Sequence, residues 1–188
     1  MIKYSYINFV NETGKTMNKV AIVINGGGGV GKDTLCDLAA KHFNVVNIST
    51  ITPIKELAKM AGWKGEKTDK ARKYLADLKA LCVAYNNFPT EWALSRYNEF
   101  LNSDSQILFV HIREPEEISK FVSATGGRAR TLLVRAANRL KRALYGNSAD
   151  DCVENYGYDY YFSNDGTLEE AESGFVALLG SILDGENL

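Results

Sequence analysis

Short runs of aliphatic and aromatic residues alternate along this chain with longer segments of helical periodicity. The short runs predict five buried strands, over 20–24, 45–48, 107–110, 132–134 and 160–162. Apolar residues three and four positions apart predict helices over 32–42, 52–62, 71–85, 90–101, 115–122 and from 167 onward. Strands that alternate with helices form a mostly parallel sheet that is covered on both faces. The predicted fold class is therefore α/β, with a five-stranded sheet.

Two of the predicted helices carry start signals. Pro53 follows Thr52 and would occupy the first helical position, where its missing N–H group costs nothing. Thr167 and Glu170 have the spacing of a capping box, in which each side chain bonds the backbone N–H of the other residue. We expect one face of this last helix to be buried; that face consists of Leu168, Ala171, Phe175, Leu178, Leu179 and Ile182.

The helix predicted over 71–85 is strongly amphipathic. Its apolar residues recur every three or four positions, whereas Arg72, Lys73 and Lys79 lie off that stripe. We therefore expect the stripe to face the core and the three cations to lie outside it. The stripe consists of Tyr74, Leu75, Leu78, Leu81, Cys82 and Tyr85.

The length of 188 residues fits one domain. The first sixteen residues show no clear periodicity, and Met17 stands just before the first strand. We predict that 1–16 form an N-terminal extension and that 17–188 form the compact domain.

Composition narrows the function classes. With 22 basic and 23 acidic side chains, the net charge is −1, so the chain lacks the excess of positive charge that is typical of proteins that bind a nucleic acid polymer. No apolar run approaches the length of a membrane span, so no membrane partner is expected. The three cysteines are far apart, which argues against a disulfide framework or a zinc site. We predict a cytoplasmic protein.

A phosphate-binding loop is the strongest chemical signal in the sequence. It follows a predicted buried strand and precedes a predicted helix, which is the context that such a loop requires. Glycines allow the backbone N–H groups to form a cradle, and the helix amino end and a lysine add positive charge. The loop and its expected nucleotide ligands are Gly26, Gly27, Gly28, Gly29, Val30, Gly31, Lys32, Asp33 and Thr34.

Asp33 departs from the general pattern of such loops, in which a serine or threonine hydroxyl binds magnesium. We expect the Asp33 carboxylate to hold Mg²⁺ directly or through a water, because this ion takes one or two carboxylates and keeps several waters. We expect Thr34 to contact an α- or β-phosphate oxygen. The cofactors predicted from the loop are therefore ATP and Mg²⁺.

The Gly-Lys-Asp-Thr sequence at 31–34 resembles the phosphate loop of phage deoxynucleoside monophosphate kinases, within the P-loop nucleoside and nucleotide kinase superfamily. The resemblance runs from Met17 over nearly the whole chain and includes Thr52–Lys55, Arg72 with 75–79, Ile112–Arg113 and 158–168. It implies a three-layer P-loop NTPase fold, acceptor-binding helices over about 50–104 and a short lid over about 135–157. It also places Asn164 in a loop on the nucleobase side of the nucleotide. His111 stands where relatives often carry an aspartate that organises magnesium.

Three cations are candidates to bind an anionic acceptor, two arginines and a lysine. A guanidinium group can hold a phosphate with two bonds, which a lysine cannot do. Arg113 follows a buried strand and should emerge at the carboxyl end of the sheet, where open α/β sheets bind ligands. A salt bridge to Glu114 or Glu116 is the structural alternative. The resemblance adds Arg72 and Lys55, although Arg72 could also lie on a solvated helix face.

The densest basic stretch of the chain lies between 128 and 142. In kinases of the resembling family, lid arginines neutralise the transferring phosphoryl group and exclude water. We assign this catalytic role, with Lys32, to Arg135 and Arg139; a basic solvated helix is the alternative. Asp150 and Asp151 could pair with the closed lid or help to bind the acceptor; a role in a loop or as a helix cap is the alternative.

These features predict an ATP-dependent phosphotransferase that acts on a small phosphorylated acceptor, most simply a nucleoside or deoxynucleoside monophosphate. A kinase of a non-nucleotide acceptor, such as phosphomevalonate, dephospho-coenzyme A or a sugar acid, is the first alternative. A non-catalytic ATP-binding switch is the second. A switch would not need the cluster of arginines.

Overall fold

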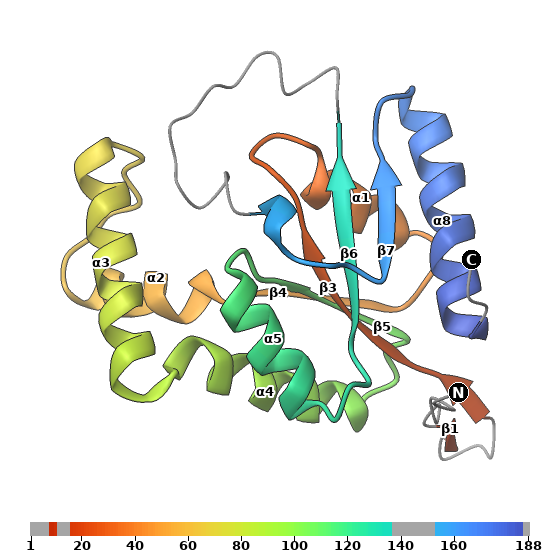
Figure 1. Ribbon diagram of the computed structural model, residues 1–188, viewed down its shortest axis with the longest axis horizontal. Coiled ribbons are helices and arrows are strands. Elements are labelled where there is room, and N and C mark those ends of the chain that lie inside the picture. Colours follow the sequence, from red (N-terminus) through yellow and green to blue (C-terminus); the bar gives the residue numbers. More distant parts are fainter. Residues whose placement is uncertain (1–7, 11–15, 137–152, 186–188) are drawn as a thin grey trace.

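A computed structural model describes residues 8–10, 16–136 and 153–185 of the chain. Its main sheet has five parallel strands in the spatial order β4-β5-β3-β6-β7 (Figure 1). The strands are β3 (Val20–Asn25), β4 (Val45–Ser49), β5 (Ile107–His111), β6 (Arg130–Arg135) and β7 (Tyr160–Ser163). All five predicted strands are confirmed, with boundaries that differ by one or two residues.

Helices cover both faces of this sheet, which confirms the three-layer α/β prediction. The helices are α1 (Lys32–Ala39), α2 (Ile51–Met60), α3 (Asp69–Asn86), α4 (Phe88–Leu101), α5 (Pro115–Ala124) and α8 (Leu168–Asp184), with a 3-10 turn η1 (Val153–Asn155) before β7. No helix among the described residues is both long enough and apolar enough to cross a membrane.

The central strand β3 shows how the sequence forms two cores. Because successive side chains of a strand point to opposite faces, Ile22 and Ile24 pack with residues of α1 and α8, whereas Ala21 and Val23 pack with residues of α4 and α5. All six residues of β3 are buried, as expected for a strand covered on both sides.

The loop after β3 lies at the point where the chain changes direction across the sheet. After β3 the chain forms β4 and β5 on one side of it, and later β6 and β7 on the other. In open parallel sheets, ligands bind outside the carboxyl ends of the strands at such a point. The topology therefore makes residues 26–31 the expected place for a ligand.

Helix α2 begins earlier than predicted, at Ile51 rather than at Pro53. Both the backbone N–H and the hydroxyl of Thr50 donate to the His111 carbonyl oxygen, at 3.2 and 3.3 Å. These bonds fix the chain to the end of β5, and it enters the helix directly. Pro53 is tolerated as the third helical residue because the first N–H groups of a helix have no partner within it.

The prediction that the apolar stripe of α3 faces the core is wrong. Tyr74, Leu81 and Tyr85 are 37%, 69% and 88% exposed. The helix packs mainly on α2 and α4 and lies away from the sheet (Figure 1), so only part of the stripe has a surface to cover it. On α8, the capping box is confirmed, but Leu168 is 60% exposed because it lies in the first turn, beyond the edge of the core.

Strands β1 (Asn8–Val10) and β2 (Thr16–Asn18) pair antiparallel in a separate two-stranded sheet. Strand β2 crosses the predicted boundary between 16 and 17 and leads directly into β3. The division of the chain into 1–16 and 17–188 stays a prediction.

Candidate functional site

The predicted phosphate-binding loop joins the carboxyl end of β3 to the amino end of α1. Gly26 passes so close to β6 that a Cβ atom there would lie 2.3 Å from the Val134 carbonyl oxygen. Gly31, the residue before α1, has a φ of 93°, a left-handed conformation that glycine adopts without strain. The glycines at these two positions are therefore required by the loop geometry.

Lys32 opens α1, and its side chain turns back across the loop. Its ammonium group donates to the carbonyl oxygens of Gly26 and Gly27, at 2.5 and 3.0 Å. The positive charge thus lies over the loop, in the place where a bound phosphate oxygen would compete with the two carbonyls. This position fits the role predicted for Lys32.

A buried amide connects the loop to its surroundings. Asn25 accepts from the backbone N–H of Gly26 at 2.8 Å and donates to the Arg113 carbonyl oxygen at 3.0 Å and to the Tyr158 hydroxyl at 2.8 Å. Tyr158 in turn donates to the Val153 carbonyl oxygen at 2.9 Å. Asn25 therefore ties the phosphate loop both to the strand end that carries Arg113 and to the segment before β7. Sequence reasoning missed it, although a polar residue that ends a β-branched run was a usable signal.

Asn164 braces the loop from the other side. It is 4% exposed, and its amide donates to the Val30 carbonyl oxygen at 2.8 Å. Its backbone N–H donates to the Arg135 carbonyl oxygen at 2.7 Å. The burial of Asn164 favours a role in positioning the backbone of the loop over binding a nucleotide directly, and its place on the nucleobase side stays a prediction.

His111 and Asp33 face each other at the end of β5. Nε2 of His111 lies 2.8 Å from Oδ1 of Asn47, and because an amide oxygen can only accept, Nε2 carries the proton. The other ring nitrogen, Nδ1, lies 4.0 Å from a carboxylate oxygen of Asp33. Burial lowers the pKa of His111, against the opposing effect of Asp33, so the ring is neutral at neutral pH.

Arg135, the last residue of β6, is held by a carboxylate. Its Nε and Nη2 donate to the two oxygens of Glu154 at 3.1 and 2.5 Å, and its guanidinium lies 4.7 Å from the centre of the Tyr161 ring. A role in catalysis would require Arg135 to leave Glu154. The other predicted lid residues, Arg139, Lys141, Arg142, Asp150 and Asp151, lie outside the described residues.

Two other arginines of the basic stretch lie at the amino end of β6. Arg128 and Arg130 precede or begin β6, so they lie at the opposite end of that strand from the phosphate loop. These two side chains are therefore not part of the candidate site.

The three residues that we predict to bind the phosphoryl acceptor lie on different elements of the fold. Arg113 is exposed just beyond β5, and its backbone is bonded to Asn25 beside the loop. Lys55 and Arg72 are exposed on α2 and α3, and Arg72 forms a 3.4 Å ion pair with Asp69 within the first turn of α3. The structure brings Arg113 next to the phosphate loop and places the other two on the helices beyond β4.

Lys79 is an unexpected component of this region. It lies off the apolar stripe of α3, yet its side chain is only 12% exposed and pairs with Glu114 at 2.5 Å and with Glu117 at 3.0 Å. Both acids follow Arg113 closely in sequence. The ion pairs therefore connect α3 to the beginning of α5, directly after Arg113, the residue expected to bind the acceptor.

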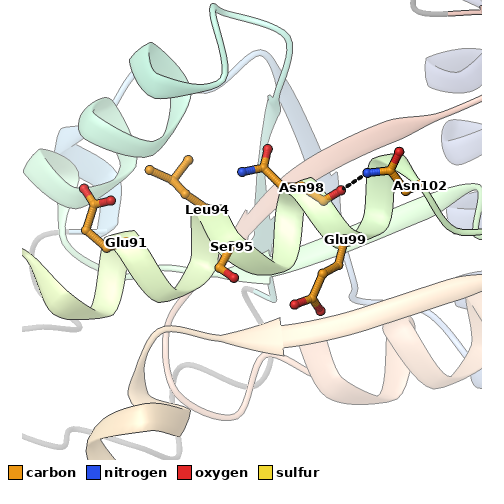
Figure 2. A pocket seen from close by; sticks show the side chains of 6 residues that line it. All are labelled: Glu91, Leu94, Ser95, Asn98, Glu99 and Asn102. Atoms are coloured by element: carbon orange, nitrogen blue, oxygen red, sulfur yellow. Dashed lines mark hydrogen bonds between the residues drawn. The ribbon is translucent and has the colours of Figure 1, made fainter.

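A hollow elsewhere on the molecule lies along one face of α4 (Figure 2). Two of its lining side chains, Glu91 and Glu99, are carboxylates, which repel phosphate. None of the predicted site residues lines it, and we therefore place the candidate site at the phosphate loop. The lining residues are Glu91, Leu94, Ser95, Asn98, Glu99 and Asn102.

The comparisons with known proteins agree with this fold. No family model and no curated protein matches the chain. A tunicamycin resistance protein from Deinococcus radiodurans has a TM-score of 0.55 at 14% identity, over 86% of this chain and 96% of its own. A candidate kinase from Chloroflexus aurantiacus has a TM-score of 0.53 at 14% identity, over 90% of this chain and 98% of its own. Identity this low leaves the reaction open. The chain has the α/β fold of P-loop kinases.

Proposed function

We propose that this protein is an ATP-dependent phosphotransferase that moves the γ-phosphoryl group of ATP·Mg²⁺ to a small phosphorylated acceptor. One observation carries the proposal: the Lys32 ammonium lies over the loop at 26–31, at the edge of the sheet where Arg113 and Arg135 also emerge. We assign this loop as the anion cradle. Transfer between two anionic substrates needs cations on both sides of the transferred group. This edge of the sheet supplies them.

The residues of the loop fit a nucleoside triphosphate. The N–H groups at the amino end of α1 would bind the phosphates, and Lys32 would exchange its bonds to Gly26 and Gly27 for bonds to phosphate oxygens. Asp33 is 92% exposed beside the loop, so its carboxylate is accessible to Mg²⁺. That ion, when bound, would neutralise charge on the triphosphate. Thr34, also exposed, would contact an α- or β-phosphate oxygen.

Catalysis would come from positioning and charge. Well-oriented reactants lower a barrier by about 7–11 kcal/mol relative to free ones. Asn25 supports this by holding the phosphate loop and the Arg113 backbone with one amide group. Arg135 and Arg139 would reach the transferring group once Arg135 leaves Glu154, and their approach would exclude water.

A nucleoside or deoxynucleoside monophosphate is the acceptor we propose first. Arg113 would bind its phosphate, and Arg72 and Lys55 would approach through movement of α2 and α3. A guanidinium recognises a phosphate whatever the phosphate is attached to, so a non-nucleotide phosphate ester is the second candidate.

The test is ADP release with ATP·Mg²⁺ against all ribo- and deoxynucleoside monophosphates, followed by non-nucleotide phosphate esters. We expect turnover with at least one monophosphate. Arg113→Ala should raise the KM of that acceptor by about tenfold or more, through loss of a charged hydrogen bond, and leave the KM of ATP nearly unchanged. Arg128→Ala, at the far edge of the sheet, is the matched control. Failure of every phosphorylated acceptor in a protein that still binds ATP would refute the proposal.

A further inference from the structure

Helix α3 carries an exposed apolar stripe that the proposed reaction does not use. Among the described residues, three of the six exposed large hydrophobic side chains lie on it: Tyr74, Leu81 and Tyr85, at 37%, 69% and 88% exposure. Leu78 lies between them and is half-buried. The helix packs on α2 and α4 and lies at the outer edge of the molecule (Figure 1). Neighbouring exposed apolar side chains of this kind mark an interaction surface.

We propose that this stripe binds a second copy of the chain, with the two α3 helices antiparallel about a two-fold axis. The inference goes beyond the proposed function and does not depend on it, because the association needs neither ATP nor an acceptor. The partner is identified by the order of the residues, by the exposed area and by the charges beside the stripe.

The stripe has the same residue types in both directions. It runs Tyr74, Leu78, Leu81, Tyr85, with steps of four, three and four residues. A two-fold axis halfway along it therefore places Tyr74 against Tyr85 of the second copy and Leu78 against Leu81. An interface between identical copies about a two-fold axis must be complementary to itself in this way. Steps of four and three residues are also those of the apolar seam between two packed helices.

The exposed area suits the centre of a modest interface. An aromatic side chain offers about 150–250 Å² for burial, so Tyr74 and Tyr85 at their observed exposures supply about 250 Å². Each partner of a standard interface buries about 800 Å², with an apolar centre and a polar rim. Leu81 adds to the centre, and the polar side chains of α3 form part of the rim. We therefore expect a dimer that dissociates at micromolar concentrations.

The charges beside the stripe are compatible with this pairing. The row next to it on the helix consists of Lys70, Asp77 and Ala84. The antiparallel axis brings Asp77 closest to Ala84 of the second copy, which has no charge. Asp77 is also paired with Lys73 of its own helix at 2.8 Å. Like charges that face each other oppose association, and this arrangement avoids them at the centre of the interface.

The test is sedimentation velocity of the full, untagged chain from low to high micromolar concentration, without nucleotide. We expect a reversible change from the monomer mass to twice that mass. Leu81→Glu should raise the dissociation constant by at least about 100-fold, because an unpaired carboxylate enters the apolar centre from both copies. The matched control is Leu168→Glu, since Leu168 is 60% exposed in the first turn of α8, and this variant should dimerise like the parent protein. Circular dichroism checks that both variants are folded.

A charge exchange tests the antiparallel orientation. Tyr74→Lys and Tyr85→Glu should each weaken the dimer, whereas the double variant should dimerise more tightly than either single one, because the axis brings the two new charges together. A parent protein that stays monomeric at the highest concentration would overturn the inference and leave the stripe to a different partner. Unchanged dimerisation of Leu81→Glu, an equal loss in Leu168→Glu, or a double variant weaker than both single ones would also overturn it.

Discussion

Replacement of Lys79 by methionine should destabilise the protein far more than the loss of an exposed surface ion pair would. The variant keeps a long unbranched side chain and removes the ammonium group, with its charge and its hydrogen bonds. It leaves Glu117, whose side chain is 7% exposed, without its cation. Within the described part of the chain, Oε2 of Glu117 already has no hydrogen-bond partner. Removing one member of a buried pair costs about 3–5 kcal/mol, because the remaining charge stays desolvated.

The measurement is urea unfolding at pH 7. It compares the free energy of unfolding of each variant with that of the parent protein, on the condition that the slope of this free energy against urea concentration is unchanged. Lys73→Met is the matched control, since Lys73 pairs with Asp77 on the same helix with 77% and 61% exposure. Such an exposed pair contributes about 0.3–0.5 kcal/mol. The double variant Lys79→Met with Glu117→Leu should recover most of the loss, because no buried charge remains. A Lys79→Met variant that loses no more stability than Lys73→Met would refute this reasoning.

Three further predictions follow from burial and close contact. Burial raises the pKa of Glu117 above 4.5, so its contribution to stability is present below pH 4.5 and is lost as pH rises through the folded-state pKa; urea unfolding of Glu117→Gln should show a flatter pH dependence. Burial also raises the pKa of Cys36 to about 12, so peptide-resolved alkylation at pH 8 should modify the partly exposed Cys82 faster than Cys36; equal rates for these two thiols would contradict the described packing. Gly26→Ala should cost more than about 1 kcal/mol of stability and lower ATP affinity, measured by calorimetry, because its Cβ would meet the Val134 carbonyl oxygen at 2.3 Å.

Local patterns predicted most of the fold. The strands and the phosphate loop are predictable because short apolar runs, glycine spacing and a following lysine are properties of a few neighbouring residues. The capping box of Thr167 and Glu170 is local in the same way, and it is confirmed.

The predictions that failed or were missed concern contacts between residues that are far apart in the sequence. Periodicity identified one face of α3 but could not show that little covers Tyr85, or that Lys79 meets Glu117 of another helix. The bonds of Asn25 to Tyr158 and of Arg135 to Glu154 join residues that only the completed fold brings together. The resemblance connected His111 and Asp33 to the same magnesium ion, but only the completed fold shows that the two side chains lie 4.0 Å apart.

The central claim is that the γ-phosphoryl group leaves ATP for an acceptor through the Lys32 site. The most direct measurement is a single turnover with γ-³²P-labelled ATP and the best acceptor from the panel, followed by separation of the products. We predict that the label appears in the acceptor, that Lys32→Met abolishes the transfer, and that Lys41→Met, on the exposed surface next to Glu172, retains it. Label found only in inorganic phosphate, or equal transfer by the Lys32→Met variant, would contradict the account.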